Sequence, residues 1–169
     1  QFRIAPGAGF AAIAGGQGLL FRADGGAPPG SVTVDGSPVQ SIHPGPDGRF
    51  ALVRAESGRT EVWTLDPAVP CEGQSRHEGV VAPAAERPCR VKVLAERSRS
   101  AGFSPDGWRA FVSDMEHTIN TDVMIEQIDG TAEAAPGESL FELRPSVALW
   151  SAGAWDEPPR AIELPGVGR

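Results

Sequence analysis

The sequence contains no apolar run long enough to cross a membrane. Its longest apolar stretch, residues 7–21, is interrupted by three glycines and a glutamine at positions 15–18, and it is shorter than the ~20 residues that a spanning helix needs. It also has no segment with the charged start and compact apolar centre of a secretion signal. Since residue 1 is Gln rather than Met, we expect a processed product from which a targeting segment has been removed.

Positive charge is scarce as well. Lys92 is the only lysine, and 15 Lys and Arg residues face 22 Asp and Glu residues, which gives a net charge of −7 at pH 7. Non-specific binding of nucleic acid depends on arrays of basic side chains that neutralise phosphates, and attraction to anionic membrane surfaces needs similar clusters. We therefore expect neither nucleic acid nor a membrane surface as a partner.

The composition is poor in helix-forming residues. The 21 glycines and 16 prolines occupy about 22% of the chain, against roughly 12% in an average protein, and these two residues are the least compatible with helices. A hydrophobic content of 40% argues against disorder, which needs low hydrophobicity together with high net charge. The composition predicts a turn-rich, all-β protein.

Four short segments with the composition of β-strands recur along the chain. They are rich in β-branched, leucine or aromatic residues and are bounded by turn formers; they lie at residues 18–24, 49–56, 108–114 and 146–152. Each is followed by a polar loop and a second apolar stretch, at residues 31–34, 60–65, 122–128 and 160–164. Most of the second stretches alternate apolar and polar residues, as half-buried strands do. We interpret the pattern as a repeat of antiparallel strands.

Turn signals precede two of the four segments. Residues 45–48 read Gly-Pro-Asp-Gly and residues 104–107 read Ser-Pro-Asp-Gly. In such a turn proline presets φ at the second position, Asp caps the turn locally, and Gly takes the positive φ that follows. We expect a β-hairpin at each of these turns.

Residues 102–114 read GFSPDGWRAFVSD and are followed by TDVM at 121–124 and IDG at 128–130. This stretch of residues 102–130 resembles the TolB-like, WD-like β-propeller repeat. Residues 45–66 resemble it as well, with Gly45 where the family has Ser, whereas the first and fourth units lack the Pro-Asp-Gly turn. The resemblance implies an array of short antiparallel blades. It also implies a role in docking envelope proteins, or as an accessory domain beside an enzyme.

The spacing of the units predicts a β-propeller-like array of about four blades. If Phe21, Val53, Val112 and Trp150 are equivalent, the intervals are 32, 59 and 38 residues. The long interval contains an insertion at residues 70–88, without which it falls near the ~40–45 residues of a blade. We predict a single domain over residues 1–169, either a small four-bladed ring or part of a larger propeller. An irregular β-sandwich built from the same hairpins is the third alternative.

Only two cysteines are present, and Cys71 and Cys89 bracket the insertion. In an exported protein a bond between them would close a polar loop of 19 residues and contribute about 3 kcal/mol in the loop-entropy model. Free thiols, or a metal site that includes His77, are the alternatives, but the close CxxC pairing of structural zinc sites is absent. We expect the disulfide.

Oxygen ligands gather in residues 114–122, where Asp114, Glu116 and Asp122 could bind calcium or a transition metal beside His117. The segment lacks the alternating acidic pattern and central glycine of an EF-hand, so a solvated loop is the favoured interpretation. The sequence also has no Gly-x-Ser-x-Gly elbow and no phosphate-binding loop. We predict no catalytic residue and no cofactor.

The four tryptophans divide into two pairs. Trp63 and Trp108 fall within the repeated strands, where an aromatic residue usually belongs to the core. Trp150 and Trp155 lie in the C-terminal part that matches the repeat poorly, and an exposed aromatic with polar neighbours is the usual anchor of a protein interface. We name Trp150 and Trp155 as candidate partner-binding residues, with ordinary packing between blades as the alternative.

The sequence thus predicts a non-catalytic binding or assembly module of an exported or envelope-associated complex, periplasmic or secreted. Its propeller loops would dock a protein partner, an inference that rests on analogy with other propellers. Two alternatives stay open at this point. The chain could be an accessory propeller domain or a fragment of a prolyl oligopeptidase-like hydrolase, or it could be a metal-dependent propeller enzyme.

Overall fold

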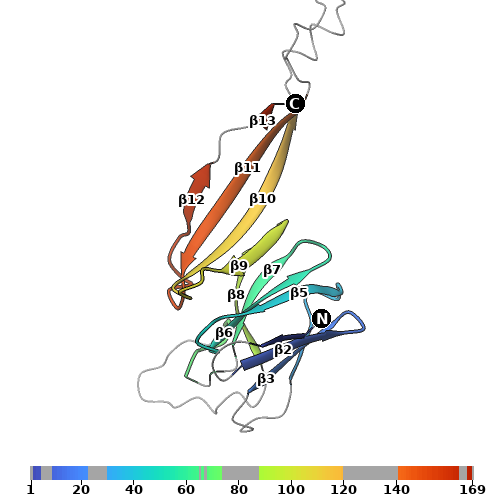
Figure 1. The fold of residues 1–169 in the computed structure, drawn as a ribbon, viewed down its shortest axis with the longest axis vertical. Coiled ribbons are helices and arrows are strands. Elements are labelled where there is room, and N and C mark those ends of the chain that lie inside the picture. Colours follow the sequence, from blue (N-terminus) through green and yellow to red (C-terminus); the bar gives the residue numbers. More distant parts are fainter. Residues whose placement is uncertain are drawn as a thin grey trace, which may run out of the picture.

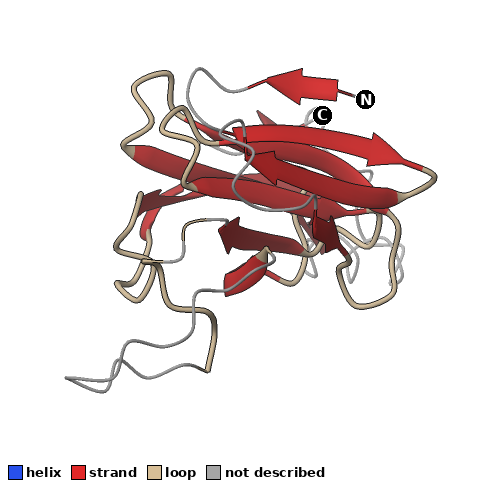
Figure 2. Cartoon of the chain, turned by 90° about the horizontal axis from the view of Figure 1, so that it is seen from below, coloured by secondary structure: helices blue, strands red, loops and turns tan. Residues whose placement is uncertain are grey.

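The structure is a computed structural model of the chain, and its regular elements are strands. It describes residues 2–4, 9–22, 30–64, 66, 68–73, 88–119, 141–163 and 167–168. Every regular element in these ranges is a β-strand (Figure 2), which confirms the all-β prediction. Within the same ranges we find no helix with the length and apolarity needed to cross a membrane.

In the described ranges, thirteen strands form three antiparallel sheets. The first sheet contains β1 (Phe2–Ile4), β2 (Gly9–Ala14), β3 (Gln17–Arg22) and β4 (Gly30–Val32). The second contains β5 (Val39–Pro44), β6 (Phe50–Ala55), β7 (Thr60–Thr64) and β8 (Cys89–Ala95). The third contains β9 (Ser100–Phe103), β10 (Arg109–Ile119), β11 (Phe141–Ser151), β12 (Arg160–Glu163) and β13 (Val167–Gly168). The first four strands of each sheet pair in chain order, so every sheet is built around a meander.

The predicted array of about four blades corresponds to three sheets in the described part of the chain. The third and fourth predicted segments, 108–114 and 146–152, pair with each other as neighbouring strands of one sheet, with Ala110 opposite Trp150 and Val112 opposite Ala148. The two segments therefore belong to one sheet, because they are hydrogen-bonded neighbours in it. The predicted strand at 122–128 lies outside the described residues.

The first predicted segment, 18–24, also takes a different place from the second. Its described residues belong to β3, the third strand of its sheet, whereas Val53 lies in β6, the second strand of the next sheet. The cause is a tight turn at Gly15 and Gly16, both with positive φ, which splits the apolar stretch 7–21 into β2 and β3. Phe21 and Val53 are therefore not equivalent positions, and the interval of 32 residues does not measure a repeat.

The three sheets stack face to face, with the second sheet in the middle (Figure 1). The strand β6 contributes alternate side chains to two cores. Ala51, Val53 and Ala55 pack with residues of the first sheet, and Phe50 and Leu52 pack with residues of the third. Each fully buried Val, Leu or Phe contributes roughly 1.5–3 kcal/mol. The central sheet is thus covered on both faces, and the paired strands β10 and β11 extend beyond the stack.

The two Pro-Asp-Gly turns form as predicted and join β5 to β6 and β9 to β10. The amide of Gly48 donates to the carbonyl of Gly45 at 3.0 Å, and that of Gly107 donates to Ser104 at 2.9 Å. Gly48 and Gly107 have φ of 69° and 75°. The Asp in each turn accepts a hydrogen bond from the backbone two residues later. The two turns also touch, because Pro46 of the first lies directly over Gly107 of the second.

Ser98 lies in the link from β8 to β9 and forms hydrogen bonds at the end of the second sheet that is away from its Pro-Asp-Gly turn. Its hydroxyl group contacts the Thr60 hydroxyl at 2.7 Å and donates to the Gly58 carbonyl at 2.8 Å. Its own carbonyl accepts two hydrogen bonds from Arg54, and burial lowers the pKa of that guanidinium. The link into the third sheet is therefore tied to the turn between β6 and β7.

The predicted disulfide is present and joins Cys71 to Cys89, with 5.7 Å between their Cα atoms. It closes the connection between β7 and β8, because Cys89 is the first residue of β8. The described part of the chain has no free cysteine. His77, named in the metal alternative, lies outside the described residues.

Replacing Gly107 with Ala is expected to destabilise the protein more than replacing Gly36 with Ala. Both glycines have positive φ, but a Cβ at Gly36 would meet nothing within 4 Å, whereas one at Gly107 would lie 2.1 Å from Pro46 Cγ. We expect the free energy of unfolding to fall by about 1 kcal/mol for Gly36→Ala and by about 2–4 kcal/mol for Gly107→Ala. Urea unfolding measures both, and equal losses would contradict the turn-to-turn contact.

Candidate binding site at the turn edge

The two Pro-Asp-Gly turns, residues 45–48 and 104–107, lie at one end of the strands of the second and third sheets. We call the surface formed by these turns and the residues around them the turn edge. Arg49 and Phe50 follow the first turn immediately, and both line two adjoining clefts at this edge. Phe50 is buried in the core while the Arg49 side chain is about half exposed. The edge therefore combines a fixed apolar floor with a charged surface.

The larger cleft has a volume of about 750 Å³. It is formed by the start of β6, the start of β8, the disulfide segment and the turn between β11 and β12, and its apolar lining includes Phe50, Val69, Val91 and Trp155. The rings of Phe50 and Trp155 meet edge to face, with centroids 5.2 Å apart. This contact joins the second sheet to the third at the base of the cleft.

Two cations and two carboxylates complete the lining of the larger cleft. Arg49 donates through Nε to Asp66 at 2.8 Å, and its guanidinium lies 5.6 Å from the centre of the Phe50 ring. Lys92 lies 3.9 Å from the fully exposed Asp156, and Glu72 is bound by Arg90. Charges of both signs are thus present, and most of them have a partner.

Trp155 is a buried residue of the cleft lining, and its indole nitrogen has no hydrogen-bond partner. The side chain is only 4% exposed, and among the buried polar side-chain atoms of the described residues its Nε1 alone makes no hydrogen bond. A buried donor without an acceptor costs ~1–3 kcal/mol. The unpartnered N–H group of Trp155 therefore lowers the stability of the folded protein.

The smaller cleft, about 390 Å³, lies between the two turns and carries an exposed tryptophan. Trp108 is 72% exposed, and among the described residues it is the large hydrophobic side chain that is exposed to solvent. Asp47 and Asp106 line the same cleft. A hydrogen bond from the Ser104 hydroxyl, helped by one from the Trp108 backbone amide, lowers the pKa of Asp106.

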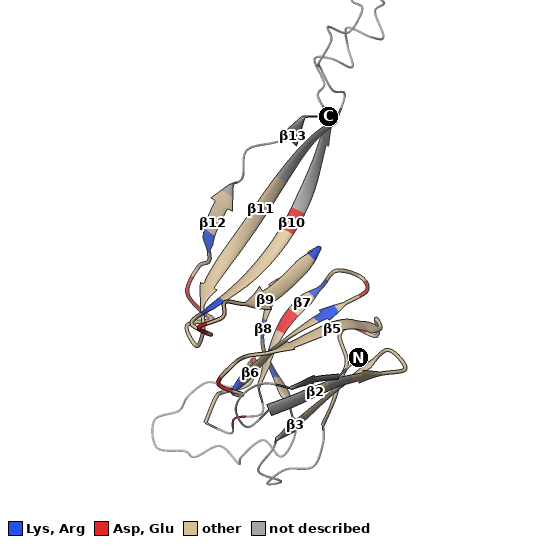
Figure 3. Ribbon diagram, viewed as in Figure 1, with Lys and Arg blue, Asp and Glu red and all other residues tan. Residues whose placement is uncertain are grey.

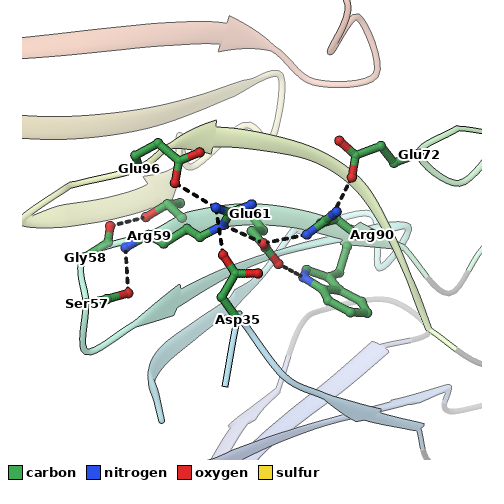
Figure 4. A network of polar contacts seen from close by, with 10 residues as sticks. Asp35, Ser57, Gly58, Arg59, Glu61, Glu72, Arg90 and Glu96 are labelled. Atoms are coloured by element: carbon green, nitrogen blue, oxygen red, sulfur yellow. Dashed lines mark hydrogen bonds and ion pairs between the residues drawn. The ribbon is translucent and has the colours of Figure 1, made fainter. Parts of the chain in front are cut away.

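A buried carboxylate holds the wall of the larger cleft in place (Figure 4). Glu61, on β7, is fully buried; its Oε1 accepts hydrogen bonds from Arg59 at 2.9 Å and Arg90 at 3.1 Å, and its Oε2 accepts one from Trp63 at 2.9 Å. Glu61 lies on β7, an inner strand of the second sheet, and Figure 3 shows an acidic stretch in red on that strand. Arg90 in turn binds Glu72, next to the disulfide.

The carboxylate partners of the two arginines in this network raise the pKa of each guanidinium. The hydrogen bond to Glu61 raises the pKa of Arg59, and Asp35 and Glu96, each 2.7 Å from its Nη1, act in the same direction. Burial lowers the pKa of Arg90, but its hydrogen bonds to Glu72 and Glu61 outweigh that effect and raise it overall. Both cations bind the buried carboxylate of Glu61 and neutralise its charge.

Of the candidate metal ligands Asp114, Glu116 and Asp122, Asp114 alone has a side chain within the described residues. Asp114 and Glu116 lie in β10, and Asp114 makes contacts of its own. Asp122 lies outside the described residues, and so do the side chains of Glu116 and His117. The described residues contain no group of three His, Cys, Asp or Glu side chains placed to hold a metal ion.

Burial favours the packing alternative for Trp150 and Trp155, whereas Trp108 takes a place that differs from the one expected. Trp150 and Trp155 are 6% and 4% exposed and belong to the core between the second and third sheets, so the exposure on which their partner-binding role rested is not found. Trp108, expected in the core, is exposed instead. A signal for this exists in the sequence, because aligning the two Pro-Asp-Gly turns places Trp108 at the position of the half-exposed Arg49.

Comparisons of the chain with protein-family models, with curated proteins and with solved structures found no match. The resemblance to the TolB-like repeat therefore stays a prediction.

Replacing Glu61 with Gln is expected to lower the free energy of unfolding by about 3 kcal/mol, because Arg59 and Arg90 then lose their shared buried counter-charge. Glu96→Gln is the matched control. It removes a carboxylate from the same Arg59, but Glu96 is 72% exposed, and we expect a loss below about 1 kcal/mol. Urea unfolding measures both variants, and comparable losses would show that the buried carboxylate is not the centre of the network.

Proposed function

We propose that this chain is a β-propeller-type binding module with no catalytic site of its own, which docks a protein partner through the turn edge. The face-to-face stack of antiparallel meanders supports this fold, because adjacent propeller blades pack in this way. The three described sheets form an open stack, and a closed propeller needs at least about four blades. We therefore interpret these sheets as consecutive blades that form part of a larger propeller.

The exposed Trp108 is the observation that carries the binding role. It is 72% exposed at a concave surface between two turns that are held together by Pro46 and Gly107. Large aromatic side chains presented on a rigid support contribute most of the binding energy in protein interfaces. Binding through Trp108 would also require little ordering of the loops, because both turns are already fixed by backbone hydrogen bonds.

The disulfide supports a location outside the cytoplasm. Disulfides persist in oxidising compartments, and small exported domains use them where the core is thin. The Cys71–Cys89 bond closes a connection next to the larger cleft. We propose a periplasmic or secreted protein that works as part of an envelope-associated assembly, as the TolB-like resemblance implies.

Trp108→Ala is expected to reduce capture of the native partner at least about tenfold, the effect of losing a hot-spot aromatic, while the melting temperature stays unchanged because the side chain is exposed. The tagged protein is crosslinked in an extract of its source, and recovered proteins are quantified by mass spectrometry. The control is Glu56→Ala, because Glu56 is exposed and directly follows β6, at the end of the strand away from the turn edge. A native protein that runs as a lone monomer, or equal recovery by both variants, would contradict the proposal.

A further inference from the structure

The third sheet has a face that no other sheet of the described chain covers. The first and third sheets lie at the two ends of the stack (Figure 1), and one face of the third packs on the second through Ala110, Val112 and Trp150. Since side chains alternate along a strand, Phe111 and Leu149, which pair across β10 and β11, lie on the opposite face. Both are only partly buried, and neither belongs to either core.

The equivalent face of the second sheet is covered completely. Counted from the glycine of each Pro-Asp-Gly turn, Phe111 stands at the same position as Leu52. Leu52 pairs with Val62 across β6 and β7, as Phe111 pairs with Leu149 across β10 and β11. Leu52 and Val62 are fully buried against the third sheet. The outer face of the third sheet thus repeats a face on which a further sheet packs.

The contact between neighbouring sheets has a constant direction. At the third and fifth positions after the turn glycine, an Ala and a Val face the preceding sheet in both β6 and β10; these are Ala51 and Val53, and Ala110 and Val112. The larger side chain between them points to the other face. A free outer face of the third sheet therefore matches the opposite end of a similar stack, rather than another copy of the same face.

The first sheet provides that opposite end. Its Ala11, Leu20 and Val32 are buried against the second sheet. Leu19 and Ser31 pair across β3 and β4 and, by alternation, lie on the face that points away from the second sheet. Leu19 is only partly buried and Ser31 is exposed. Neither side chain carries a charge that an apolar sheet would have to bury.

The charges at the outer face of the third sheet also permit a contact. Arg109 and Arg160 are exposed and lie on this face at its end near the turn edge, two residues from Phe111 and opposite Leu149. The chain as a whole has a net charge of −7. Two arginines at the rim therefore reduce the repulsion that a second acidic chain would meet there.

We propose that a second copy of the chain packs its first sheet on the outer face of the third sheet, head to tail. The copy suits this face because its sheets have the same strand order and the same direction of stacking. Head-to-tail contacts form a closed ring when the rotation between copies closes. Two copies with three sheets each would lie within the ~4–8 blades of closed propellers. This inference rests on the proposed function, which interprets the sheets as blades of a larger propeller.

Sedimentation equilibrium of the purified chain tests the contact. We expect a dimer at concentrations of about 1–100 μM. Phe111→Glu should raise its dissociation constant at least about a hundredfold, because both of its identical contacts then bury a charge in place of an aromatic ring. Val147→Glu changes the same face away from Gly102, over which the Phe111 ring lies, and should act in the same way. Thermal unfolding followed by circular dichroism checks that each variant is folded.

A charge exchange between the two faces tests the head-to-tail arrangement. Leu19→Lys alone should also prevent dimerisation. An equimolar mixture of the Leu19→Lys and Phe111→Glu proteins should form dimers again, because one contact is then unaltered and the other opposes Lys to Glu. The control is Gln40→Glu, which adds the same charge at an exposed position of the middle sheet and should leave the dimer unchanged.

The outcomes separate this inference from the proposed function. A purified chain that stays monomeric over the whole range, or a Phe111→Glu or Val147→Glu protein that dimerises as tightly as the parent, would overturn the self-association. A dimer that is lost in Phe111→Glu but kept in Leu19→Lys would overturn the head-to-tail contact. Trp108 lies at the turn edge, so a monomeric chain that still captures a partner through Trp108 would leave the proposed binding role standing.

Discussion

The alternation of side chains along β6 specifies both sheet–sheet contacts of the molecule. Ala51 and Val53 face the first sheet, and Phe50 and Leu52 face the third. A strand that is covered on both faces must be apolar at consecutive positions, as buried strands of other folds are. Since the side-chain period is two, a shift of one residue would exchange the two faces at once. The register of this one strand therefore determines where both neighbouring sheets lie.

The turn edge owes its position to the same strand. Phe50 is the first residue of β6 and is buried, and Arg49 precedes it at the surface. The turn before them is held against the next turn by Pro46 over Gly107, so the clefts on either side of Arg49 have a rigid base. Binding surfaces on rigid elements lose less entropy when they bind, which is why this edge suits recognition.

The sequence was informative wherever the structure is decided by near neighbours. The two Pro-Asp-Gly turns, the all-β class and the Cys71–Cys89 bond depend on residue types close together or on a single pair of cysteines. The pairing of β10 with β11 and the burial of Trp150 depend on contacts between distant segments, which local patterns do not specify. The candidate site was missed for the same reason, because its lining comes from four separate parts of the chain.

The buried network around Glu61 shows why charge is kept inside such a small core. An apolar side chain could fill the place of Glu61 at similar stability, since ion pairs gain little over well-packed hydrophobic residues. It could not, however, fix Arg90, and through Arg90 it could not fix Glu72 at the wall of the larger cleft. The disulfide sets the spacing of the two chain segments there, and the arginine sets the direction of the carboxylate between them. The shape and charge of the cleft thus depend on Glu61, whose carboxylate is fully buried.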